Sequence, residues 1–144
     1  MALVTRDNPK LTLEGARAVV AAAERRAVEI GVPMNIAVVD DGGHLLAFIR
    51  MDGAKLSSVQ IAMNKAEAAA IRRQPSGPAM SGDQPNVMLS LGLAIGSHAR
   101  QTPIRGGLPL MVDGKCVGAI GISNGTEEQD VDVARAGVTA LEKA

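Results

Sequence analysis

The chain has 144 residues, 47% of them apolar, and its 15 basic and 15 acidic side chains give a net charge of zero. This composition predicts one globular domain over residues 1–144, and the balanced charge gives no reason to expect a nucleic-acid or membrane partner. Phe48 is the only aromatic residue, which excludes the stacking platforms that bind single-stranded nucleic acid.

The first predicted element is a helix over residues 13–30. Thr12 can cap its start, Gly31 can end it, and Pro33 blocks continuation. Spacings of three and four predict a buried stripe made of Leu13, Ala16, Val20, Ala23, Ala27 and Ile30. Charged residues interrupt the N-terminus early, and no apolar run is long enough to span a membrane. We therefore expect a cytoplasmic protein.

The stretch "MNIAVVDDGGHLLAFIRM" predicts a strand, a turn at Asp41-Gly42-Gly43 and a second strand. Both faces of these strands are apolar, with Ile36 and Val38 on one side and the alternate residues on the other. A strand that is apolar on both faces needs cover on both. We expect helices on the two faces of the sheet, or a second subunit over one of them.

A second helix is predicted within residues 55–73. Its expected buried stripe is Val59, Ala62, Met63, Ala66 and Ala70, with a cap at Ser57 or Ser58. Residues 74–86 are rich in proline, glycine and serine and predict a loop. Residues 87–99 are consistent with either a short helix or an irregular apolar segment.

Residues 108–112 and 115–123 predict a second hairpin, joined by Asp113-Gly114. Gly118 and Gly121 lie inside the second of these strands, which indicates a bulge or a close backbone approach by a ligand or another subunit. Thr126 and Gln129 fit a capping box before a last helix, whose stripe is Val131, Ala134, Val138 and Leu141. The element order predicts an α/β (α+β) fold: a profilin-like three-layer sandwich with a central antiparallel sheet and flanking helices.

Four stretches, "AVVDDGGHLLAFIRMDGA", "SSVQIAMNKAEAAA", "IRGGLPLMVDGKCVGAIGIS" and "GTEEQDVDVARAG", resemble the GlcG/HbpS-like family, a haem-degrading domain family. The family includes the C-terminal domain of the PduO cobalamin adenosyltransferase. The resemblance runs from about residue 11 to residue 141. It implies a profilin-like sandwich and a homo-oligomer, commonly a dimer, tetramer or octamer. It also implies either haem binding or a catabolic role, including tautomerase or hydrolase steps.

The resemblance also implies a haem-iron ligand, a histidine in the N-terminal helix region, and this chain departs from it there. Residues 11–30 contain no histidine, so we expect no cofactor by that route. His44 and His98 are the only imidazoles left as haem ligands. His44 alternates with Leu46 and Phe48, which predicts that it lies against an apolar layer. No cluster of His, Cys, Asp and Glu has metal-ligand spacing, and the single Cys116 forms no intrachain disulfide.

Arg105-Gly106-Gly107 has two interpretations. It is either a flexible strand entry with Arg105 in solvent, or a backbone nest whose N–H groups hold an anion beside Arg105. From the sequence, folding alone does not require the two glycines. Thr126 is first a helix cap, although a helix N-terminus can also hold an anion. The acidic residues that follow, Glu128 among them, suit a cationic or proton-exchanging group better.

Two further sets of charged residues have both structural and functional interpretations. Lys65 is expected just off the buried helical stripe, either solvated or facing a pocket where a desolvated amine could act as base or acid. Arg50 and Asp52 point to the same side of a strand end. They form either a surface ion pair or a site in which Arg50 holds a substrate carboxylate.

The leading hypothesis is a small-molecule-binding protein of a catabolic pathway, with a pocket at a subunit boundary. In one version of this hypothesis it is an enzyme, a cofactor-independent tautomerase, hydratase or hydrolase for a small carbonyl or carboxylate compound. Lys65 or Glu128 would move protons, while Arg50 or Arg105 would hold the anion near Asp52, Gly106, Gly107 and Thr126. The alternatives are a non-enzymatic haem or tetrapyrrole-binding or accessory protein, and a scaffold subunit.

Overall fold

The computed structural model describes all 144 residues. In chain order the elements are α1 (Leu13–Ile30), β1 (Asn35–Asp40), β2 (Leu45–Arg50), η1 (Leu56–Ser58), α2 (Val59–Arg72), β3 (Met80–Ser81), β4 (Gln84–Pro85), α3 (Val87–Gly96), β5 (Gly107–Val112), β6 (Lys115–Ser123) and α4 (Glu127–Glu142). None of the helices combines the length and the apolar run that a bilayer crossing requires.

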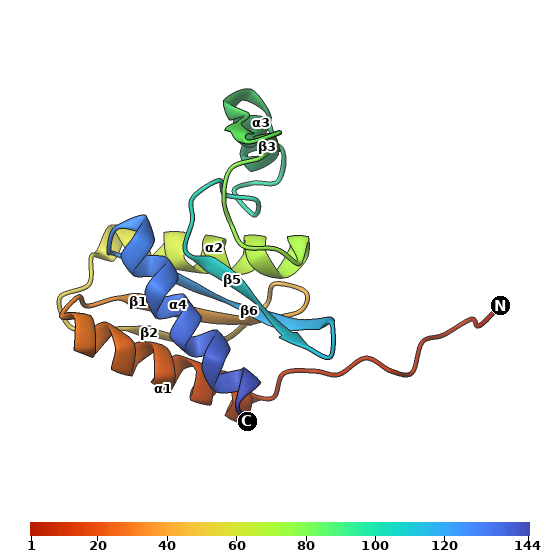
Figure 1. Cartoon of the computed structure of the whole chain (residues 1–144), viewed down its shortest axis with the longest axis horizontal. Coiled ribbons are helices and arrows are strands. Elements are labelled where there is room, and N and C mark those ends of the chain that lie inside the picture. The colour runs from red at the N-terminus through yellow and green to blue at the C-terminus, as the bar shows by residue number, and fades with distance from the viewer.

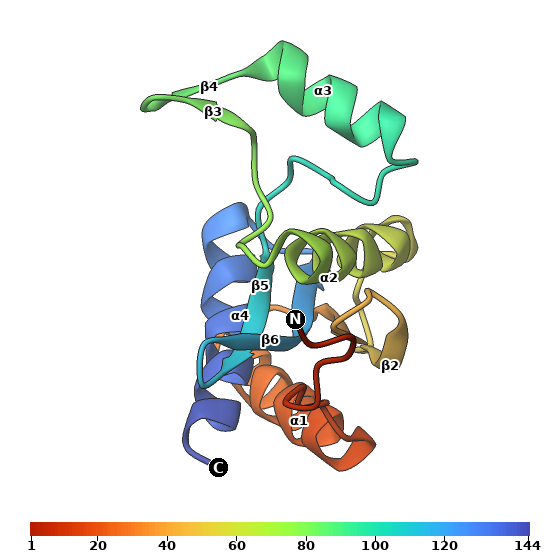
Figure 2. The same ribbon diagram turned by 90° about the vertical axis from the view of Figure 1, so that its right-hand side faces the viewer.

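The central sheet has the strand order β2-β1-β6-β5, and all three pairings are antiparallel. Helices α1 and α4 lie side by side on one face, and α2 covers the other (Figures 1 and 2). The predicted three-layer sandwich is therefore confirmed. β1 and β6 are the inner strands, which explains why β1 is apolar on both faces.

The two faces of the sheet carry different cores. On the α1/α4 side, Ile36 and Val38 belong to a cluster of 16 buried residues that includes most of the large aliphatic side chains. On the α2 side, Ala37 and Val39 belong to a cluster of seven, of which six are alanine. Small side chains bring two layers close together, so α2 packs against the sheet at short range.

Two strand glycines mark how close α2 comes. A Cβ atom on Gly121 would lie 2.1 Å from the carbonyl oxygen of Ala62, and one on Gly107 would lie 2.1 Å from the carbonyl oxygen of Lys65. No side chain fits at that distance, so both positions must be glycine. The close approach predicted for Gly121 is confirmed, and the approaching backbone belongs to the chain's own helix.

The predicted turn and cap signals are largely confirmed. The Thr12 hydroxyl accepts a hydrogen bond from the Gly15 N–H, and the capping box of Thr126 and Gln129 forms completely. Asp113 and Gly114 have φ values of 50° and 76°, as a tight two-residue hairpin requires. Ser58 occupies the N-cap position of α2, but its side chain makes no capping hydrogen bond.

The segment between α2 and β5 differs from a simple loop. It contains the β3–β4 hairpin and the helix α3, whose start is capped by the Asn86 side chain accepting from the Leu89 N–H at 3.0 Å. We call residues 77–104 the arm, because this segment rises away from the sandwich on the α2 side (Figures 1 and 2). The ambiguous apolar segment is therefore a helix.

The close approach of α2 yields a stability prediction for Gly121→Ala. Its methyl group would push α2 from the sheet, so we expect the free energy of unfolding to fall by about 2–3 kcal/mol, as overpacking typically costs. Urea unfolding followed by circular dichroism measures the change. Gly77→Ala is the matched control, because its Cβ would meet only the Arg105 side chain at 3.5 Å. Equal losses in both variants would contradict the close-packing account.

Candidate functional site

Lys65 lies inside the protein. Its side chain is 2% exposed, and Nζ donates hydrogen bonds to the Asp130 carboxylate and to the Ile122 carbonyl oxygen, both at 2.8 Å. The expectation of a position off the buried stripe is wrong. The true stripe of α2 is Ala62, Lys65, Ala66 and Ala69, at the spacing i, i+3, i+4, i+7. Lys65 therefore ties α2 to β6 and α4.

Asp130 completes this buried pair from the first turn of α4. Its second carboxylate oxygen accepts a hydrogen bond from the Gly125 N–H at 2.9 Å, and the residue is 2% exposed. Burial raises the pKa of the Asp130 carboxyl, and the hydrogen bond and charge of Lys65 oppose that shift. The positive end of the α4 dipole also favours the ionised carboxylate. The arrangement is that of a structural ion pair with few free donors or acceptors.

The Arg105-Gly106-Gly107 turn is explained by packing against this pair. Gly106 has φ +126°, and a Cβ on it would lie 2.8 Å from the Ile122 oxygen and 2.9 Å from Lys65 Nζ. The Gly107 N–H donates to the Ser76 hydroxyl at 2.8 Å, so it is not free to hold an anion. The expectation that folding does not require these glycines is wrong. The clash with buried neighbours could not be foreseen without the tertiary structure.

An open hollow of about 550 Å³ lies outside the buried pair, at the start of α4. Arg105, Glu127, Glu128 and Val131 line it. Arg105 Nε is 3.6 Å from Glu127 Oε2, and both side chains are about half exposed. The Thr126 hydroxyl is occupied by its cap bond from the Gln129 N–H at 3.2 Å. The hollow thus brings together two predicted residues, Arg105 as an anion holder and Glu128 as a proton carrier.

Arg50 and Asp52 lie elsewhere. Arg50 ends β2, at the opposite edge of the sheet from β5, and both residues are exposed. They form no ion pair with each other, so the structural interpretation of the pair is wrong. They also line none of the main surface hollows. The predicted single pocket is therefore divided between two edges of the sheet, and the substrate role of Arg50 and Asp52 stays a prediction.

Both histidines are exposed. His44 was expected against an apolar layer, but the pairing of β1 with β2 shifts at Val38/Val39, which breaks the alternation that links it to Leu46. His98 follows α3 with φ 53°. Neither imidazole lines a main hollow, and no three His, Cys, Asp or Glu side chains lie close enough to hold a metal ion. Their role as haem ligands stays a prediction.

An apolar groove of about 410 Å³ runs between α1 and β2. It is lined by Leu13, Arg17, Val20, Ala21, Glu24, Leu46, Ala47, Phe48 and Ile49. It exists because β2 is an edge strand that α1 covers only in part, leaving its residues half exposed. The sequence indicated that β2 is apolar on both faces. It did not show that the face toward α1 would stay partly uncovered.

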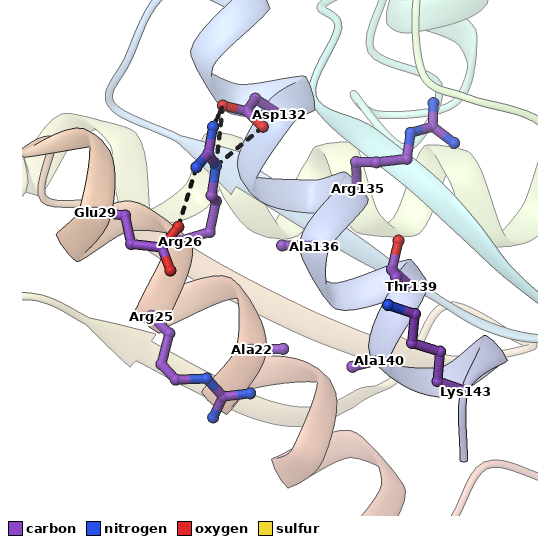
Figure 3. Close-up of a pocket in the computed structure, with 10 residues that line it drawn as sticks. All are labelled: Ala22, Arg25, Arg26, Glu29, Asp132, Arg135, Ala136, Thr139, Ala140 and Lys143. Atoms are coloured by element: carbon purple, nitrogen blue, oxygen red, sulfur yellow. Dashed lines mark hydrogen bonds and ion pairs between the residues drawn. The ribbon is translucent and has the colours of Figure 1, made fainter.

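A second hollow of about 410 Å³ lies between α1 and α4 (Figure 3). Small residues, Ala22, Ala136 and Ala140, lie along it, and basic side chains stand at its rim. Arg26 is held there by the Asp132 carboxylate at 2.9 Å and by Glu29 at 3.0 Å. Sequence reasoning missed this hollow, because the two helices that form it are far apart along the chain.

Comparison with known proteins gives matches along the whole sandwich. The model of the family "Haem degrading protein HbpS-like" matches residues 11–139. A 15.0 kDa protein from the dhaT–dhaS intergenic region of Citrobacter freundii is 41% identical over 120 residues, covering 83% of this chain and 84% of the relative. The crystal structure of Klebsiella pneumoniae protein ORFY superposes with a TM-score of 0.88 at 33% identity, covering 100% of this chain and 98% of that one. The crystal structure of a PduOC–haem complex superposes with a TM-score of 0.80 at 28% identity, covering 92% of this chain and 95% of that one.

The buried pair makes a prediction about stability. Lys65→Met leaves the Asp130 carboxylate buried without its partner, so we expect the free energy of unfolding to fall by about 3–5 kcal/mol. Asp130→Asn should cost a similar amount. The double variant should lose less than the sum of the two, because neither charge is then orphaned. Urea unfolding of the four proteins measures this coupling. Strictly additive losses would contradict a direct ion pair.

Proposed function

Because the chain belongs to the HbpS-like family, we propose that it binds haem or a related tetrapyrrole and is not itself an enzyme. The observation that carries this proposal is the similarity to the PduOC–haem complex, which extends over 92% of the chain with a TM-score of 0.80. That likeness covers the sheet and the flanking helices, so it concerns the whole domain and not a local motif.

The groove between α1 and β2 has the chemistry that this ligand needs. Its walls are mainly aliphatic, which suits a flat apolar macrocycle, whereas the Phe48 ring packs toward the alanine cluster under α2. Arg17 belongs to the same groove and can pair with a carboxylate carried by the ring. Bound haem would supply an iron centre, whose behaviour depends on its axial ligand and on solvent access.

His44 is our candidate for the iron ligand. α1 contains no histidine, so a ligand from that helix is absent. His44 comes directly before β2, whose residues Leu46–Ile49 line the groove, whereas His98 lies in the arm, just after α3. The His44 side chain is exposed, so it can change rotamer at little cost. We also propose that the chain acts as a homo-oligomer.

A second candidate function rests on the hollow at the start of α4. There Arg105 can hold a carboxylate, while the Glu128 carboxylate takes a proton from the carbon beside a carbonyl group and delivers it to the carbonyl oxygen, giving the enol; the reverse transfer restores the ketone. The result would be tautomerisation of a small oxo acid. Lys65 takes no direct part in this version, because its amine is buried against Asp130 and Ile122.

The haem proposal is tested by titrating the chain with hemin and recording visible absorbance. We expect a saturable Soret band at one haem per chain. His44→Ala should weaken binding at least about tenfold, or roughly 1.4 kcal/mol, and shift the band. His98→Ala is the matched control and should bind as the wild type does. If no saturable band develops, the chain does not bind haem and the proposal fails.

The second candidate is tested with pyruvate in D₂O, using proton NMR to follow exchange of its methyl protons. We expect catalysed exchange that Glu128→Gln abolishes. Arg105→Gln should raise KM, because the carboxylate loses its partner. Glu142→Gln, at the other end of α4, is the control and should leave the rate unchanged. If the Glu128→Gln variant exchanges the methyl protons at the wild-type rate, Glu128 is not the group that carries the proton.

A further inference from the structure

The outward side of α3 has the pattern of a buried helix face. Met88, Leu91, Gly92 and Ile95 follow the spacing i, i+3, i+4, i+7, which places them in one stripe. The side chains of Met88, Leu91 and Ile95 nevertheless have exposures of 82%, 51% and 77%. The other side of the helix is the sheltered one, where Ser90 is buried. We call these four residues the α3 stripe.

Two glycines in α3 have no explanation within the chain. Gly92 and Gly96 are one helical turn apart, and a Cβ on either would have no neighbour within 4 Å. A glycine inside a helix costs about 1 kcal/mol relative to alanine. Everywhere that glycine is needed for packing in this fold, as at Gly121, the close neighbour is present. At Gly92 and Gly96, a second helix approaching closely would supply the missing neighbour.

Charge and area indicate what that second helix belongs to. Residues 84–97 contain no charged side chain, so two identical copies can meet there without burying an unpaired charge. Apart from Ile104 at its base, the exposed large apolar residues of the arm are Met80, Val87, Met88, Leu89, Leu91 and Ile95. Together they offer roughly 600 Å², close to the ~800 Å² that each partner contributes to a standard interface.

A lipid surface fits this helix less well than a second copy of the chain does. Residues 74–99 contain no lysine or arginine, and Arg100 at the base of the arm is paired with Glu67, so α3 and the β3–β4 hairpin have no cation to hold a lipid phosphate. The ten residues of α3 are also too short to cross a bilayer, which needs about 20.

We infer that the α3 stripe is a self-association surface, packing against the α3 stripe of a second copy of this chain. A two-fold axis would pair the same residues from both copies, with Gly92 close to the point where the helices cross. This inference gives the proposed homo-oligomer its contact surface. It does not depend on haem binding.

The test is the mass of the full chain in solution without haem, measured by sedimentation velocity. The wild type should sediment as a dimer or a larger assembly of the 14.8 kDa chain. Ile95→Glu places a charge in the contact and should reduce the assembly by at least one dimerisation step, with an unchanged helical circular dichroism spectrum. Val28→Glu is the control, since Val28 is 66% exposed on α1 and should keep the wild-type mass.

Gly92→Leu distinguishes close helix packing from loose apolar contact. The added side chain enlarges the apolar surface but blocks close approach, so we expect it to weaken the assembly as Ile95→Glu does. A wild type that sediments at 14.8 kDa would overturn the inference, whether or not it binds neutral vesicles. The inference would also be overturned if Ile95→Glu or Gly92→Leu sedimented with the mass of the wild type, or if Val28→Glu lost as much mass as Ile95→Glu. A monomer that still gives a saturable Soret band would overturn this inference alone and leave the haem proposal standing.

Discussion

The short distance between α2 and the sheet is the constraint on which the rest of the structure depends. Alanines on α2 and glycines at 107 and 121 allow the two backbones to approach until no side chain fits between them. Lys65 then reaches past the sheet end to Asp130 on α4 and to the Ile122 carbonyl. One side chain thereby joins the helix on one face, an inner strand and a helix of the opposite layer.

This constraint determines where a ligand can bind. The sheet end at β5 and β6 is filled by the Lys65–Asp130 pair and by Gly106, so little room remains there for a small molecule. The available surfaces lie outside: the apolar groove along α1 and β2, the hollow at the start of α4, and the hollow between α1 and α4. Of these, the groove has the apolar character that a tetrapyrrole requires.

Local signals predicted the fold well, because they act over a few residues. Thr12, Asp113-Gly114 and the Thr126 capping box each form as expected. The candidate site was predicted less well, because it depends on contacts between distant segments. The burial of Lys65 depends on Asp130, which is 65 residues away, and the exposure of His44 depends on a register shift in the β1–β2 pair. Arg105 and Glu128 are the exception, because the antiparallel β5–β6 hairpin places the start of β5 beside the end of β6, which leads into α4.

The central claim is that the ligand surface is the α1/β2 groove and that the Lys65–Asp130 end is structural. The most direct test is amide NMR of the labelled chain during addition of hemin, whose paramagnetic iron broadens nearby signals. The account predicts broadening at Arg17, His44 and Leu46–Phe48, with signals of Lys65, Gly106 and Asp130 unchanged. Broadening centred on Gly106 and the start of α4, with the groove unaffected, would contradict it.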